Sequence, residues 1–237
     1  CCSNLKVMGV HVDGGLQEEM VIGLDRLHKV PEDMPDDVAV LAEPTSIAYH
    51  AVLRSEIQVG QTAVVFGAGA IGLLISLLLL KARGCRALVV DIDPDRLELA
   101  RSVGAIPIQG DPSAIKEQVA QITAGDMADV VFEVTGNVRC TQQTVDLVAH
   151  AGRIVLIGWN PGAVELDTVT LMRKEVELVG SRNSRNAFPY VLRLFEDQVI
   201  DPTILITHRF RLEETPKALA MLDKGEESPL KILIEAR

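Results

Sequence analysis

Six residues in the middle of an apolar segment have the spacing of a turn that binds phosphate. Within VVFGAGAIG, the run from Gly67 to Gly72 fits the pattern G-x-G-x-x-G. The first glycine permits a tight turn, the second lets the main chain approach a pyrophosphate, and the third lets the next helix pack closely on a sheet. The helix amino end adds unpaired N–H groups and the positive end of its dipole. The residues expected to bind a dinucleotide here are Gly67, Ala68, Gly69, Ala70, Ile71 and Gly72.

An acidic residue stands where such a turn requires one. Asp91 follows the apolar segment 87–90, about 20 residues after Gly72, where a carboxylate accepts hydrogen bonds from ribose hydroxyls. A carboxylate also repels the 2′-phosphate of NADP, so Asp91 favours NAD. Arg96 would weaken the preference for NAD if its side chain reached the cofactor, so we keep Arg96 as a cofactor-binding candidate. The alternative, a solvated position on the helix 94–103, fits the sequence pattern better.

The same segment has a second interpretation. Residues 63–80 carry no charge and reach the lower end of the length of about 17–25 residues that a membrane helix needs. Residues 63–66, however, are β-branched and aromatic, as in a buried strand, whereas 70–82 are rich in Leu, Ile and Ala, as in a helix ending near Gly84. The change of pattern favours strand, turn and helix over a membrane span.

Strand and helix patterns alternate through the centre of the chain. The expected strands are 63–66, 87–90, 105–108, 130–133, 153–157 and 176–179. The expected helices between them are 70–82, 94–103, 112–122 and 139–149. This order predicts an α/β fold with a doubly wound parallel sheet of the Rossmann type.

Two flanking segments complete the expected domain organisation. The first holds a strand pattern at 16–22 and a short helix at 36–41, and the second holds helices at 189–197 and 212–224 and a final strand at 231–234. We expect three parts: a remnant of a partial, mostly β catalytic domain at 1–54, the dinucleotide-binding domain at 55–180 inserted in it, and a return to the catalytic domain at 181–237.

Ligands of such sheets bind beyond the carboxyl ends of the strands. The residues at or just after these ends are therefore pocket candidates, although each also fits an ordinary loop role: Thr135, Gly136, Ile157, Gly158, Trp159, Ser181 and Arg182. Of these we expect Thr135, Ile157 and Gly158 to contact the cofactor.

Composition limits the partners. The net charge of −10 argues against a nucleic-acid partner, because such binding depends on neutralising phosphates. The first residues show no signal-peptide pattern, and isolated Cys85 and Cys140 fit reduced core thiols. We expect a cytoplasmic protein that binds no membrane, represented here without its N-terminal part.

The sequence resembles the zinc-containing medium-chain dehydrogenases, in the branch with sorbitol, threonine and sugar-acid dehydrogenases. The resemblance spans nearly the whole chain. It depends on the order of GVHVDGG (9–15), AEPTSIAYHA (42–51), VVFGAGAIG (64–72), FEVTGN (132–137), GRIVLIG (152–158), ITHRF (206–210) and ALAMLDKG (218–225). It implies a catalytic zinc ion coupled to NAD, with hydride transfer from a secondary alcohol.

The resemblance also implies metal ligands. Glu43, in the sequence Ala-Glu-Pro, matches a family zinc ligand and is our catalytic candidate; without the resemblance, a helix cap or an ion pair is the better interpretation. Cys2 matches the last cysteine of a structural zinc lobe. The upstream zinc cysteine and the Gly-His-Glu motif of the family have no counterpart in this sequence. We therefore expect this chain, on its own, to bind NAD but to lack dehydrogenase activity.

Other candidates for the catalytic site are less specific. Three of them, His11, Asp13 and His50, fit structural roles better than contact with substrate or metal, and the same holds for His208. Sorbitol dehydrogenases carry Arg-Tyr where this chain has Asn183-Ser184, which weakens sorbitol as the substrate. The substrate-contact candidates are Arg182 and Asn183, and Arg182 with Arg185 suits a carboxylate, although exposed loop arginines are the alternative.

Two other functions remain open at this point. One is a zinc-free, NADPH-dependent quinone or enone reductase of the same superfamily, against which Glu43 and Asp91 argue. The other is a non-catalytic nucleotide-binding module. The resemblance implies a small alcohol or sugar-acid substrate and a homodimer or homotetramer. The edge strand 175–180 fits a subunit contact, and it fits burial within one chain equally well.

Overall fold

The computed structural model describes residues 3–225 and 227–236. The chain forms two compact units, one of residues 42–200 and one of residues 1–41 with 201–237, which we describe separately. The units therefore divide near residues 41 and 200 instead of near 54 and 180. The helix α2 (Ala42–Ser55) packs on α3 (Ala70–Leu77), on β5 (Val148–Leu156) and on α8 (Phe188–Glu196), which places both flanking helices with the sheet.

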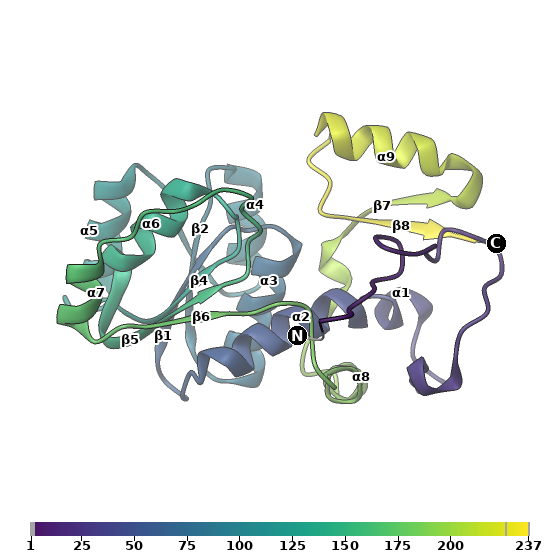
Figure 1. The fold of residues 1–237 in the computed structure, drawn as a ribbon, viewed down its shortest axis with the longest axis horizontal. Helices are drawn as coiled ribbons and strands as arrows, with labels where there is room; N and C mark the ends of the chain where they lie inside the picture. The colour runs from purple at the N-terminus through teal and green to yellow at the C-terminus, as the bar shows by residue number, and fades with distance from the viewer. Residues whose placement is uncertain (1–2, 226, 237) are drawn as a thin grey trace. The chain divides into compact units, whose positions relative to one another are not determined.

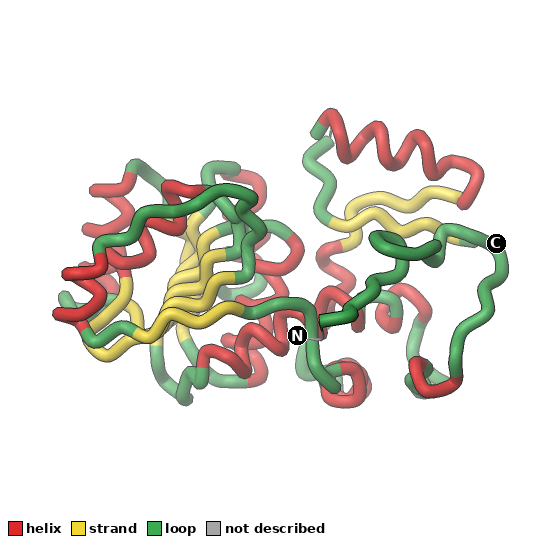
Figure 2. The backbone as a smooth tube through the Cα atoms, viewed as in Figure 1, coloured by secondary structure: helices red, strands yellow, loops and turns green. Residues whose placement is uncertain are grey.

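A six-stranded parallel sheet organises residues 42–200 (Figures 1 and 2). Its strands lie in the order β3-β2-β1-β4-β5-β6, so the direction of winding reverses between β1 and β4. The strands other than β5 are β1 (Thr62–Phe66), β2 (Arg86–Val90), β3 (Ile106–Ile108), β4 (Ala128–Glu133) and β6 (Glu177–Gly180). The predicted doubly wound Rossmann sheet is confirmed.

Helices cover both faces of the sheet because its strands are apolar on both sides. On β1, Val64 and Phe66 face the core shared with α5 (Pro112–Ile122) and α6 (Val138–Leu147), whereas Val65 lies beside α3. Figure 1 shows α5 and α6 on one side of the strands and α2 and α3 on the other. The remaining helices of this unit are α4 (Pro94–Ser102) and α7 (Thr168–Lys174).

Local sequence signals set most helix boundaries. Asp93 caps α4 through the Asp95 N–H, and Asp111 caps α5 through the Ala114 N–H, each at 2.9 Å with proline as the next residue. The 70–82 segment is helical as predicted, but after α3 its last turn is a π-helix, Leu78–Ala82. Gly84 ends it with φ of +64°.

Two expectations for secondary structure are corrected, and one helix was missed. Residues 16–22 form no strand, because no other described segment pairs with them, and an unpaired strand leaves its main-chain groups unbonded. The helix expected at 139–149 ends at Leu147, since Val148 is buried and pairs with Ala128 of β4. The helix α7 was not predicted; it buries no residue, so it lacks an apolar pattern.

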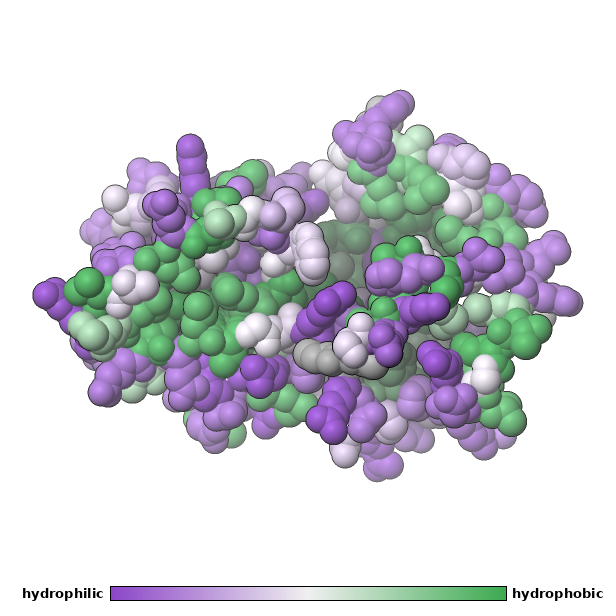
Figure 3. Space-filling model, in the orientation of Figure 1, coloured by the Kyte–Doolittle hydropathy of each residue, from purple (hydrophilic) through white to green (hydrophobic). Residues whose placement is uncertain are grey.

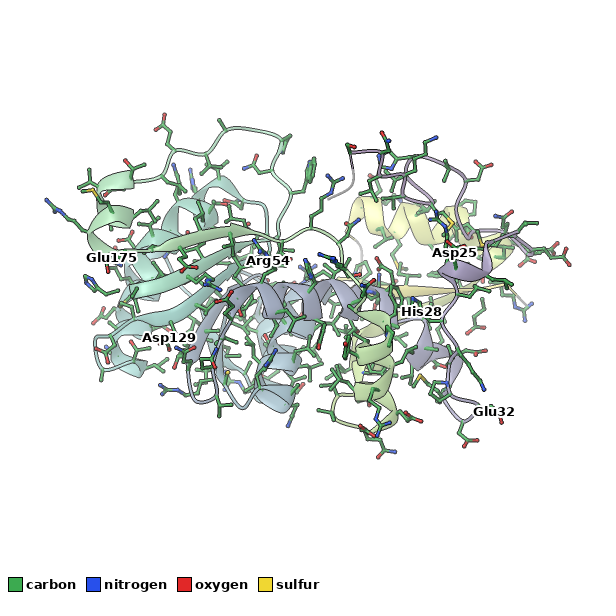
Figure 4. The ribbon with its side chains drawn as sticks, turned by 60° about the horizontal axis from the view of Figure 1, so that its bottom comes forward. Asp25, His28, Glu32, Arg54, Asp129 and Glu175 are labelled. Carbon is green, nitrogen blue, oxygen red and sulfur yellow. The ribbon has the colours of Figure 1, made fainter. Side chains whose placement is uncertain are left out.

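The second unit contains a two-stranded parallel sheet crossed by one helix. The strand β7 (Ile206–Arg211) pairs with β8 (Lys231–Glu235), and α9 (Thr215–Lys224) connects them (Figure 1). Arg209 bonds Asp37 of α1 (Asp36–Ala39) and lies 3.4 Å from Glu235. Figure 4 labels Asp25, His28 and Glu32 along the irregular segment of this unit. Short 3₁₀ turns complete it: Leu24–Arg26, Pro202–Leu205 and Leu212–Glu214.

Within the described residues, no helix has both the length and the apolar character that a bilayer span requires. The uncharged run at 63–80 is divided between β1, a turn and α3.

Candidate dinucleotide and active site

The glycine turn between β1 and α3 has the close approach that the motif predicts. Gly67 has φ of +102°, a conformation that other residues rarely adopt. A Cβ atom on Gly72 would lie 1.8 Å from the Gly67 carbonyl oxygen, so only glycine lets α3 begin this near β1. A Cβ atom on Gly69 would meet no protein atom within 4 Å. The turn therefore leaves open space beside the first N–H groups of α3, which suits a diphosphate.

Asp91 joins this turn to the carboxyl end of β2. One of its carboxylate oxygens accepts the Ala68 N–H at 2.6 Å, and the other accepts the Asp93 N–H at 2.9 Å. The main chain adds a third bond, from the Gly67 N–H to the Val90 carbonyl at 2.8 Å. Asp91 thus fixes the turn and remains only partly buried, with carboxylate lone pairs available to a sugar hydroxyl.

Arg96 lies on the first turn of α4, beside the helix cap. Its Nε atom is 3.5 Å from an Asp93 carboxylate oxygen, an ion pair without hydrogen-bond geometry, and that atom is buried with no hydrogen-bond partner. The side chain is one-third exposed. Arg96 therefore lies in the first turn of α4, which begins shortly after Asp91, and its Nε donor has no hydrogen-bond partner in the described residues.

Glu133 organises the loop after β4. Its side chain is 1% exposed, and its carboxylate accepts the Thr135 N–H at 2.9 Å, the Gly136 N–H at 3.0 Å and the Thr135 hydroxyl. Its main-chain carbonyl accepts the Ile157 and Gly158 N–H groups at 2.9 and 3.0 Å. Glu133 therefore connects the loops after β4 and β5.

The loops after β1, β4 and β5 lie close to one another. The Thr135 methyl group would lie 3.0 Å from a Cβ atom on Gly67, so the loop after β4 rests against the glycine turn. Gly158 has no room for a Cβ atom, because such an atom would lie 2.1 Å from the Gly136 nitrogen. The predicted cofactor residues after β1, β4 and β5 are thus brought together.

The loop after β6 carries the proposed substrate residues. The Arg182 guanidinium lies 5.8 Å from the Trp159 ring centroid, a cation–π contact between exposed side chains. Asn183 has φ of +51°, a conformation that asparagine tolerates better than most residues. Ser184 bonds Ser46 of α2 at 3.0 Å, which fixes this loop on the helix.

The proposed metal residues do not form a complete centre in the described residues. Glu43 lies in the first turn of α2 with an exposed side chain, and Cys2 lies outside the described residues. No group of three His, Cys, Asp or Glu side chains with metal-binding geometry occurs in 3–225 and 227–236. Glu43 can supply one oxygen ligand to a metal ion but does not form a metal site by itself.

The histidine candidates have local partners. The Nδ1 atom of His11 accepts the Val7 N–H at 3.0 Å, and His208 lies 3.2 Å from Glu227. Burial lowers the pKa of His50 on α2, and the charges of Arg54 and Arg185 lower it further. Asp13 has an exposed side chain. None of these contacts brings the histidines to the glycine turn.

Glu133 is the residue that sequence reasoning missed. It was assigned only to a strand end within FEVTGN. The available signal was a carboxylate that ends the otherwise apolar run VVF and precedes Thr and Gly, whose N–H groups are near enough to bond it.

Comparison with known proteins identifies the family of this chain. The family model described as zinc-binding dehydrogenase matches residues 70–197. A zinc-type alcohol dehydrogenase-like protein of Haemophilus influenzae is 38% identical over 98% of this chain and 68% of its own length. The L-galactonate-5-dehydrogenase of Escherichia coli is 35% identical over 89% of this chain and 62% of its own length.

A solved structure of a dehydrogenase is also similar to this chain. An alcohol dehydrogenase of Escherichia coli complexed with NADH superimposes with a TM-score of 0.93 at 30% identity, over 99% of this chain and 69% of its own. The chain thus spans about two thirds of the length of these proteins. It belongs to the zinc-binding dehydrogenase family, among the zinc-type alcohol dehydrogenases.

Proposed function

We propose that the whole protein oxidises a secondary alcohol to a ketone by transferring a hydride to NAD, with a zinc ion at the alcohol. The observation that carries the proposal is the open, glycine-lined turn at Gly67–Gly72, tied to the Asp91 carboxylate at the strand end. The bound nicotinamide would supply the hydride acceptor. The residues of this chain bind and orient it.

NAD is the proposed cofactor in preference to NADP. Asp91 presents a negative charge at the end of β2, where the adenosine ribose is held in such sheets. A 2′-phosphate there would meet this charge, and the nearby Arg96 is already paired with Asp93. Thr135, Ile157 and Gly158 are proposed to line the other half of the cofactor, because the loop after β4 meets the glycine turn and the loop after β5 meets the loop after β4.

Glu43 is the proposed zinc ligand and catalytic residue from the described part of the chain. Its oxygen donor and its exposed position suit Zn²⁺, but the described residues supply no further ligand group around it. Cys2 is proposed, as implied by the resemblance, to take part in a separate structural zinc site.

The proposed substrate is a polyol or a sugar acid. Arg182 and Asn183 extend from the loop after β6, and the exposed guanidinium suits a carboxylate. The similar protein of Escherichia coli is named for an acid of this class, L-galactonate. The edge strand β6 and the helix α7 before it expose Val169, Met172 and Leu178. Figure 3 shows hydrophobic side chains on this unit. This surface supports a homodimer or homotetramer.

The test uses the full-length protein. NADH and NADPH binding are measured by fluorescence titration, and NAD⁺ reduction is followed on matched panels of polyols and sugar acids before and after EDTA. We expect NADH to bind at least about tenfold more tightly than NADPH, and EDTA to abolish turnover without abolishing NADH binding. Tight NADPH binding with metal-independent reduction of a quinone would instead establish the reductase function. Cofactor binding without turnover on any panel would favour the nucleotide-binding module.

A further inference from the structure

Glu133 is a buried acid whose side chain accepts several hydrogen bonds. Its three partners, the Thr135 N–H, the Thr135 hydroxyl and the Gly136 N–H, all donate to the carboxylate. The Thr135 hydroxyl oxygen also accepts the Asn137 N–H. Since the Thr135 and Gly136 N–H groups can only donate, the geometry favours a carboxylate over a carboxylic acid.

This carboxylate lacks a counter-ion in the part of the chain that the structure describes. None of the ion pairs found there includes Glu133. Burial raises the pKa of the Cys140 thiol on α6, and the nearby Glu133 carboxylate raises it further. A buried, uncompensated charge is costly unless another group balances it.

The position of Glu133 indicates what that group is. Glu133 ends β4, the strand next to β1 across the reversal of strand order. In such sheets the β1–β3 half takes the adenosine, here at Asp91, and the second half takes the nicotinamide nucleotide. Thr135, which Glu133 holds, touches the glycine turn where the two halves meet. The carboxylate therefore lies under the nicotinamide half of the site.

We propose that Glu133 stabilises the oxidised cofactor relative to the reduced one. The oxidised nicotinamide ring carries a positive charge, which the arriving hydride neutralises. A fixed negative charge under this half of the site attracts NAD⁺ more than NADH, so it favours the uptake of NAD⁺ and the release of NADH. The inference depends on the proposed NAD function, and Glu133 acts in it as a positioning and electrostatic residue that does not contact the reacting atoms.

The test compares two dissociation constants in one variant. Glu133→Gln keeps the shape and removes the charge; NAD⁺ affinity is measured by calorimetry and NADH affinity by fluorescence, both with the full-length protein. A unit charge within about 10 Å at an effective dielectric constant near 20 corresponds to a roughly tenfold change in the ratio of the two constants. NAD⁺ should weaken by this factor relative to NADH, which is a shift of about 30 mV in the potential of the bound pair.

Two matched variants separate charge from structure. Thr135→Val removes a hydrogen bond to Glu133 but keeps the carboxylate, so it should weaken both cofactors by similar factors. Cys140→Lys places a cation beside the intact Glu133 and should shift the ratio in the same direction as Glu133→Gln, which keeps the test available if that variant does not fold.

The outcomes distinguish this inference from the proposed function. Equal weakening of NAD⁺ and NADH in Glu133→Gln, or an unchanged ratio in Cys140→Lys when Glu133→Gln does not fold, overturns the electrostatic role. Failure of the wild-type protein to bind either cofactor overturns the dehydrogenase function itself. A shifted ratio in the charge variants with an unshifted ratio in Thr135→Val supports the inference.

Discussion

Gly72 is the position where the structure makes its sharpest prediction. In Gly72→Ala the new methyl carbon would lie 1.8 Å from the Gly67 oxygen and 3.4 Å from a Val65 methyl group. Because non-bonded heavy atoms prefer a separation of about 3.5 Å, the first turn of α3 must move away from β1 by more than about 1 Å. The obstacle is main chain on a buried strand end, so it cannot rotate away.

The size of the effect follows from two opposing terms. Overpacking a dense core costs about 1–3 kcal/mol. Alanine recovers at most about 1 kcal/mol through its better helix propensity. We therefore expect the free energy of unfolding to fall by about 1–2 kcal/mol. Loss of even one charge-assisted hydrogen bond from the displaced N–H groups would weaken NADH binding by tenfold or more, since such a bond contributes about 1.5–3 kcal/mol.

Gly69→Ala is the informative partner of this variant. Its methyl group meets no protein atom within 4 Å and its φ of −73° suits any residue, so the free energy of unfolding should fall by less than about 1 kcal/mol. The methyl group would still occupy the space proposed for the diphosphate and weaken NADH binding. Gly15→Ala, also in open space, should change neither quantity.

Urea unfolding without cofactor and NADH fluorescence titration measure the two quantities. The reasoning fails if Gly72→Ala unfolds at the wild-type urea concentration, because the close approach would then not exist. It also fails if Gly69→Ala binds NADH as tightly as the wild-type protein does, because the open space would then not hold the cofactor.

Three further predictions concern other positions in the unit formed by 42–200. The pKa of His50 is lowered from 6.5, so the unfolded chain binds the proton more tightly, and stability should be lost as the pH falls from about 6.5; urea unfolding at pH 7.5 and 5.5 should show a smaller loss in His50→Gln. Burial raises the pKa of Cys85 and of Cys140, so both should react with iodoacetamide more slowly at pH 7.5 than a free thiol, as mass spectrometry of their peptides would show. Lys174 donates to the Val145 and Val148 carbonyls at 2.9 and 2.8 Å, so Lys174→Met should lower the free energy of unfolding by about 1–3 kcal/mol, whereas exposed Lys81→Met should change it by less than about 0.5 kcal/mol.

Local patterns predict the sheet because each strand–helix unit encodes itself. Asp93-Pro94 and Asp111-Pro112 mark helix starts within a few residues, and buried strands are continuous apolar runs, so α4, α5, β1 and β2 follow from short windows of sequence. The parallel arrangement then follows from alternation alone.

Contacts between distant loops could not be predicted in this way. The hydrogen bonds of Glu133 need a loop conformation in which two successive N–H groups turn back on the strand; the Thr and Gly in Val-Thr-Gly are compatible with that loop but do not specify it. The strand expected at 16–22 failed for a related reason. Its apolar residues fit a strand locally, but a strand also needs a partner, and pairing is not written in the segment itself.

Two aspartates in the same sheet show why topology, and not residue type, identifies the site. Asp129, labelled in Figure 4, accepts the Thr62 N–H at 2.8 Å, much as Asp91 accepts the Ala68 N–H at 2.6 Å. Asp129 lies at the amino ends of β1 and β4, where helices arrive with their carboxyl ends, and a negative charge there repels anions. Asp91 lies at the carboxyl ends, beside the amino end of α3. The same carboxylate bond therefore fastens a strand at one edge of the sheet and borders a phosphate-binding turn at the other.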